Sequence, residues 1–102
     1  MTGKRPMIVG IAWYGAEDWE EIRRISVDGD KLEDTHDAWM RSAELQREQM
    51  GRAGYYVHKI VIVPKKWAAW SRRNGIPLNG ASRAQYVAER VRLTARHLEE
   101  SK

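Results

Sequence analysis

The chain has 102 residues, of which 42% are hydrophobic and 31% charged, so we expect one folded globular domain over residues 1–102 rather than a disordered chain. It contains no cysteine, which excludes disulfides and thiolate chemistry. Its longest apolar run, residues 7–16, is about half the length of a membrane span, so we expect a cytoplasmic protein with no membrane segment and no signal peptide.

Charge is distributed unevenly along the chain. Residues 1–51 hold seven Lys/Arg and eleven Asp/Glu, a net charge of −4, whereas residues 52–102 hold eleven Lys/Arg and three Asp/Glu, a net charge of +8. Such asymmetry is typical of a basic binding face. It is equally compatible with two halves that attract each other, within one chain or between two chains.

The first half predicts a strand followed by two helices. Residues 7–14 (MIVGIAWY) are rich in Val, Ile and aromatic residues, as strands are. Residues 16–26 predict a short helix with acidic residues in its first turn, where the helix dipole favours them. A longer helix is predicted over about 35–52, with Asp34 or Thr35 as its N-cap.

The second half predicts the same order of elements. Residues 55–63 (YYVHKIVIV) are the second run that is rich in β-branched and aromatic residues. A proline then leads into a helix predicted over about 65–74, which an Asn-Gly pair ends. The last helix is predicted over about 82–99, with Ser82 and Gln85 in capping-box spacing at its start.

The two halves therefore resemble each other. Residues 1–54 and 55–102 both predict a strand, a short helix and a long helix, and Trp19 and Trp67 each stand five residues after matching positions near the strand ends. The strands of such a duplicated β-α-α unit would pair in parallel, because the chain crosses over between them through helices. The predicted fold class is a helix-rich α+β or α/β domain of two such units.

Two strands make a small sheet with two open edges. Residues 59–63 (KIVIV) are apolar on both faces of the predicted strand except at Lys59, so another surface should cover them. We expect a homodimer in which the strands of two chains form one small mixed sheet, through residues 57–63 or a helix beside them. The alternative is a monomer whose own helices cover the sheet.

Three stretches together form one pattern: a Trp helix with Ala-Glu, a Val/Ile strand, a proline, a Trp-containing helix, a glycine and an Ala-Arg helix. They are DTHDAWMRSAE (34–44), YYVHKIVIVPKKWAAWSRRNG (55–75) and ASRAQYVAERV (81–91). Over residues 14–91 this pattern resembles a set of small bacterial proteins of uncharacterised function. The resemblance implies no activity, cofactor or substrate.

The helix predicted after the proline combines aromatic and basic residues. Trp67 and Trp70 share a face of it, and four cations flank them: Lys65, Lys66, Arg72 and Arg73. Such a surface binds nucleic acid when rings stack on bases and cations neutralise phosphates. Because aromatic pairs at helical spacing usually pack inward, we favour a core role for both tryptophans.

The last helix adds arginines that lie off its apolar stripe, and they face either phosphates or acidic segments of the protein. The residues that we consider candidates to face phosphate are Lys65, Arg83, Arg90 and Arg96. No helix-turn-helix or RNA-binding signature accompanies them. Nucleic acid is therefore an alternative rather than the favoured partner, with an expected dissociation constant no tighter than about 10⁻⁶ M at physiological salt.

Folds with parallel strands bind ligands at the carboxyl ends of the strands. A candidate ligand pocket there comprises Tyr14, Asp18, Lys66 and Trp67, although we favour the simpler interpretation of a helix N-cap with a salt bridge. The three histidines are scattered, and neither a nucleophile elbow nor a phosphate loop is present. The sequence therefore assigns no catalytic residue, cofactor or metal site.

These observations favour a non-enzymatic, homodimeric binding or interaction module. A nucleic-acid-binding protein that uses its basic second half is one alternative. A small-molecule-binding or catalytic dimer with a site at the strand ends is the other.

Overall fold

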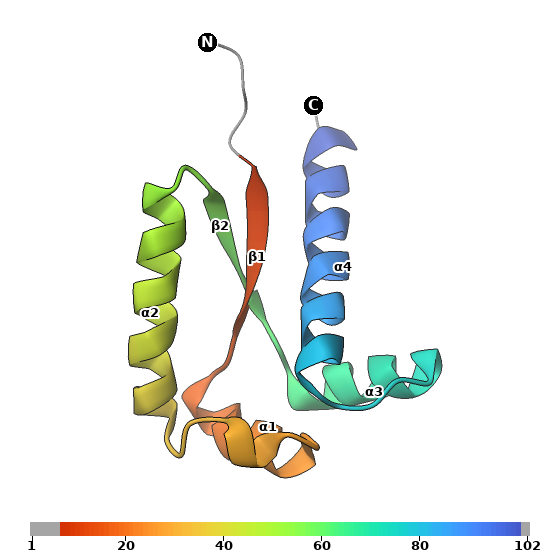
Figure 1. Cartoon of the computed structure of the whole chain (residues 1–102). Coiled ribbons are helices and arrows are strands. Elements are labelled where there is room, and N and C mark those ends of the chain that lie inside the picture. Colours follow the sequence, from red (N-terminus) through yellow and green to blue (C-terminus); the bar gives the residue numbers. More distant parts are fainter. Residues whose placement is uncertain (1–6, 101–102) are drawn as a thin grey trace.

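Figure 1 shows a helix-rich α/β fold built on two parallel strands. The computed structural model describes the backbone of residues 7–100 and the side chains of residues 7–94. Within that range the elements follow in the order β1 (Ile8–Trp13), α1 (Trp19–Ile25), α2 (His36–Arg52), β2 (Tyr56–Val61), α3 (Pro64–Asn74) and α4 (Gly80–Glu100). Two 3-10 turns, η1 (Ala16–Asp18) and η2 (Gly29–Lys31), flank α1. The predicted order of strands and helices is confirmed.

The ends of α2 and α3 follow directly from the sequence. The backbone N–H of Ala38 donates to Thr35 Oγ1 at 3.1 Å, so Thr35 rather than Asp34 caps α2. Pro64 stands in the first turn of α3, where its missing N–H leaves no hydrogen bond unmade. At the other end, Gly75 adopts a left-handed conformation with φ 65°, which glycine allows without strain.

The start of α4 differs from the prediction. The backbone N–H of Ser82 donates to Asn79 Oδ1 at 3.0 Å, and the backbone N–H of Asn79 donates to Ser82 Oγ at 3.1 Å. These reciprocal hydrogen bonds are those of a capping box, in which Ser or Thr usually stands first and Glu or Gln fourth. Here Asn79 takes the first position and Ser82 the fourth. The predicted box of Ser82 with Gln85 is therefore wrong, and α4 begins at Gly80.

One face of the sheet packs against α2. The strands are in register from Ile8 opposite Tyr56 to Trp13 opposite Val61. The ring of Trp13 meets the ring of Trp39 in an edge-on contact, with centroids 5.1 Å apart. Since Trp39 belongs to α2, that helix covers the side of the sheet on which Trp13 lies.

The opposite face packs against α4, so the strands lie between the two long helices (Figure 1). Gly10 is a point of close approach. A Cβ atom at Gly10 would lie 2.3 Å from Val91 Cγ2 and 2.7 Å from Val87 Cγ1. A glycine in the middle of β1 therefore lets α4 lie directly on the strand.

The core extends from the sheet to the two short helices. Trp19 of α1 and Trp67 of α3 are 2% and 0% exposed, and Ile22 and Ile62 are equally buried. The core role predicted for Trp67 is confirmed. Trp70 is only partly buried and packs at the margin of the same core.

Candidate binding surfaces

The outer edge of β1 carries backbone groups that β2 does not use. Met7 O accepts from the N–H of Tyr56 and Trp13 O accepts from the N–H of Ile62, both at 2.9 Å. In a strand the N–H and C=O of one residue point to one edge, and those of the next residue point to the other edge. Since Met7 and Trp13 point toward β2, the N–H and C=O groups of Ile8, Gly10 and Ala12 point away from it. Among the residues that the structure describes, no backbone hydrogen bond outside the helices and the β1–β2 ladder involves these three.

This edge forms the floor of a groove of about 710 Å³ between α2 and α4. The floor is residues 8–12. The walls are largely apolar or small side chains, among them Trp39, Ala43 and Met50 of α2 and Ala84, Val87 and Ala88 of α4. An unpaired strand edge between two apolar walls is a place where a further strand can add to the sheet.

Polar side chains line the groove near both ends of β1. Tyr14, Glu33 and Arg83 line it beside the carboxyl end of the strand, and Arg92 of α4 also contributes. Burial raises the pKa of Tyr14 to about 12, despite the opposing charge of Arg83. The Tyr14 phenol is therefore neutral at physiological pH and offers a hydroxyl, not a base.

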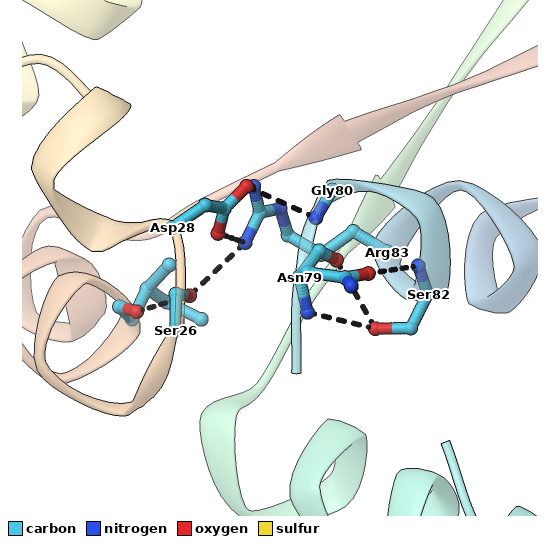
Figure 2. A network of polar contacts seen from close by, with 7 residues as sticks. Ser26, Asp28, Asn79, Gly80, Ser82 and Arg83 are labelled. Carbon is cyan, nitrogen blue, oxygen red and sulfur yellow. Dashed lines mark hydrogen bonds and ion pairs between the residues drawn. The ribbon is translucent and has the colours of Figure 1, made fainter. Parts of the chain in front are cut away.

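Arg83 belongs to a buried polar network that joins the two halves of the chain (Figure 2). Its guanidinium donates to Asp28 Oδ2 and to Ser26 Oγ, both at 3.0 Å, and the side chain of Arg83 is 9% exposed. The backbone N–H of Gly80 also donates to Asp28 Oδ2, at 3.1 Å. Arg83 thus faces an acidic residue of the first half and, in this structure, not a phosphate site open to solvent.

Asp28 is held in its charged form by this network. Its partial burial alone would raise the pKa of the carboxyl, but the hydrogen bonds and charge of Arg83, with the N–H of Gly80, outweigh burial. The pKa of Asp28 consequently lies below its ordinary value. At this point the opposite charges of the two halves meet within one chain.

A second hollow, of about 410 Å³, lies between α3 and α4. It is lined by two helical stripes: Lys66, Trp70 and Arg73 on α3, and Tyr86, Glu89 and Arg90 on α4. The indole N–H of Trp70 donates to Glu89 Oε2 at 2.7 Å, and its ring meets Tyr86 edge-on at 5.3 Å. We call this cavity the α3–α4 hollow.

The structure separates the four residues of the candidate pocket at the strand ends. Tyr14 lines the groove along β1, whereas Lys66 lines the α3–α4 hollow. Trp67 is fully buried in the core, and Asp18 stands in the 3-10 turn before α1. These side chains do not surround one cavity.

The candidate phosphate-facing residues are also dispersed. Arg90 lines the α3–α4 hollow, Lys65 is exposed on α3, and Arg83 is buried against Asp28. The side chain of Arg96 lies outside the described residues. The structure does, however, bring Lys66 and Arg90 together, one from each of the two sets that the sequence suggested.

Sequence reasoning named Arg73 among the cations of the helix after the proline, but it missed Tyr86 and Glu89 as parts of the same surface. The spacing of Lys66, Trp70 and Arg73 places them on one side of a helix and could have indicated half of the hollow. The unpaired edge of β1 has no comparable signal, because side-chain patterns do not reveal to which edge a backbone N–H points.

Comparison of the chain with protein-family models, with curated proteins and with solved structures gave no match. The resemblance to small bacterial proteins stays a prediction. In the described part of the chain no three His, Asp or Glu side chains lie together as metal ligands would, and none of its helices has the length and apolar character to cross a membrane.

Proposed function

We propose that this protein is a non-enzymatic interaction module that works as a homodimer, joined along the outer edge of β1. The observation that carries the proposal is the unpaired backbone of β1 at the floor of an apolar groove. An isolated two-stranded sheet is marginal, and exposed strand edges pair readily with other strands. A cytoplasmic location and a duplicated β-α-α unit, one in each half of residues 1–102, belong to the same proposal.

The outward-pointing residues of β1 suit a symmetric pairing. A two-fold axis normal to the sheet would run β1 antiparallel to β1 of a second copy, with Gly10 opposite Gly10 and Ile8 opposite Ala12. Each of these pairs exchanges two backbone hydrogen bonds in an antiparallel ladder. The product is a four-stranded mixed sheet with no unpaired group at its centre.

The helices fit the same arrangement. Two strands are about 9.5 Å wide, and a helix has a diameter of about 10 Å with its side chains. One helix on each face per pair of strands, as α2 and α4 provide, therefore covers a four-stranded sheet without overlap. Exposed Ala84 and Ala88 on α4 would let the two copies of that helix approach closely.

The outer edge of β1 is a better dimer contact than the outer edge of β2, although the sequence alone favours residues 57–63. On β2 the residues whose backbone points outward are Val57, Lys59 and Val61, since Ile62 points toward β1. Lys59 is exposed, and a lysine on an edge strand opposes pairing with another strand. We therefore propose that the dimer contact lies along β1 and not along residues 57–63.

The first test is the mass in dilute solution by light scattering. The wild-type protein should show twice the 11.9 kDa mass of the chain at micromolar concentrations. Ala88→Lys, which places a charge on the wall of the groove, should yield monomers, whereas Gln85→Lys adds the same charge to an exposed position of α4 outside the groove and should leave the dimer intact.

A backbone variant separates strand pairing from other contacts. Ile8→Pro removes an N–H that points away from β2, so it should spare the β1–β2 ladder and still weaken the dimer. Ile8→Val retains the N–H and serves as its control. A wild-type mass of 11.9 kDa throughout the concentration range, or dimers in both Ala88→Lys and Ile8→Pro, would contradict the proposal.

A further inference from the structure

We infer that the α3–α4 hollow is a binding site for a phosphate-bearing ligand of nucleotide chemistry, taken up either as a free nucleotide or as part of a single strand. The hollow is independent of the proposed dimer contact. On α4 the groove along β1 is lined by residues such as Val87 and Val91, whereas the hollow is lined by Tyr86, Glu89 and Arg90. A dimer joined along β1 would leave one such site open on each chain.

Cations of both helices converge on the hollow. Lys66, Arg73 and Arg90 are exposed and line the same hollow, and none of them forms an ion pair with another described residue. Of the described arginines outside the hollow, Arg23, Arg24, Arg47, Arg52 and Arg83 have a described carboxylate within ion-pair distance, whereas Arg41, Arg72 and Arg92 do not. The hollow thus concentrates more positive charge than its one carboxylate, that of Glu89, can balance, as phosphate sites do.

The hollow also contains one carboxylate. Glu89 forms no ion pair with these cations, and its Oε2 accepts the indole N–H of Trp70. Three cations and one carboxylate leave the site net positive. The second carboxylate oxygen can accept a hydrogen bond from a hydroxyl or amino group, which a sugar or a base supplies and inorganic phosphate at neutral pH supplies poorly.

Part of the wall of the hollow is aromatic. Trp70 is partly buried, and its indole ring packs edge-on against Tyr86 with 73° between the planes. An aromatic ring beside cations is the combination that proteins use to bind single-stranded nucleic acid, where bases pack on aromatic side chains. A cavity of about 410 Å³ is also within the ordinary size range of small-ligand sites.

The chain offers a closely matched test. Lys66→Glu with Arg73→Glu reverses two charges that line the hollow, whereas Lys65→Glu with Arg72→Glu reverses two exposed charges one position earlier on the same helix. Both double variants change the net charge equally. Binding of a labelled oligo-dT strand and of ATP would be measured by fluorescence anisotropy and calorimetry, at low and at physiological salt, with inorganic triphosphate and poly-Glu as comparison ligands.

We expect the lining variant to weaken binding by about tenfold or more and the flanking variant by less than about threefold, because only the first removes cations that touch phosphate. For the oligonucleotide, the slope of log affinity against log salt should fall by about 0.7 for each phosphate that the variant no longer neutralises. Binding of oligo-dT with little binding of ATP would identify a strand as the source of the phosphate, and the converse result a free nucleotide. Both results support the site.

Three results would overturn the inference. These are equal weakening by both double variants, binding of poly-Glu as tight as that of either phosphate ligand, and no binding of oligo-dT or ATP to the wild-type protein at low salt. Circular dichroism establishes that each variant is folded. If the lining variant does not fold, the milder Arg90→Gln serves in its place. It removes one cation and should weaken binding by about threefold or more. Unchanged binding in Arg90→Gln would contradict the inference.

Discussion

Arg83 and Arg90 stand about two turns apart on α4, and a helix places residues at this spacing on nearly the same side. Arg83 is buried and bonded to Asp28 and Ser26, whereas Arg90 is exposed and lines the α3–α4 hollow. The helix supplies the same kind of residue in both places. The difference comes from the neighbouring loop, because the segment after α1 brings the carboxylate of Asp28 to the first turn of α4.

The positive charge of the second half therefore lies in two different environments. Part of it, at Arg83, neutralises an acidic residue of the first half and joins the halves (Figure 2). Another part, at Lys66, Arg73 and Arg90, lies in a hollow without such a partner.

The largest expected effect contrasts the two tryptophans of α3. Trp67→Ala should lower the free energy of unfolding by about 3–5 kcal/mol, because it empties a fully buried site. Trp70→Ala removes a partly buried ring at the hollow and should cost about 1–2 kcal/mol. Urea denaturation of both variants measures the difference. Equal losses of unfolding free energy in the two variants, or an unchanged midpoint for Trp67→Ala, would contradict the assignment of Trp67 to the core and Trp70 to the hollow.

The two arginines of α4 give the next effect in size. Arg83→Ala leaves Asp28 without its partner and should lower the free energy of unfolding by about 2–3 kcal/mol, a value reduced because Asp28 keeps some contact with solvent. Arg90→Ala should change it by less than about 0.5 kcal/mol, as exposed positions do. Thermal and urea unfolding check both values. A comparable decrease in the free energy of unfolding of the two variants would contradict a structural role for Arg83 that Arg90 does not have.

The smallest effect is a dependence of stability on pH. The pKa of Asp28 is lowered in the folded state, so its contribution is fully present above the unfolded-state pKa of about 3.8 and is lost as pH falls through the lower folded-state value. The wild-type protein should therefore lose stability below about pH 4 more steeply than Asp28→Asn does. Urea midpoints between neutral pH and about pH 2.5 would reveal this, and parallel curves for the two proteins would contradict it.

The elements could be predicted because their signals are local. Proline and glycine at the ends of α3, and Thr35 before α2, act within a few residues of the backbone that they fix. The partner of Arg83 could not be predicted in this way. Asp28 lies 55 residues away in the chain, and many carboxylates of the first half were equally good partners for it.

The candidate sites show the same difference between local signals and contacts of residues far apart in the sequence. Lys66 and Arg90 were each singled out from charge and position, but their meeting in one hollow follows from how α3 and α4 pack. The groove along β1 draws its floor and walls from three elements that are separated in the sequence. No periodic pattern within a single element could therefore have indicated it.

The most direct test of the central claim, dimerisation along β1, is amide hydrogen exchange at Gly10 and Ile11. The N–H of Ile11 points toward β2 and should be protected in any folded form, whereas that of Gly10 points outward. If two copies pair along this edge, exchange at Gly10 should be slower by about a hundredfold or more at concentrations that favour the dimer than in Ala88→Lys, with Ile11 protected in both. Fast exchange at Gly10 in the wild-type protein at every concentration, beside a protected Ile11, would show that the edge of β1 remains open and would contradict the proposed dimer.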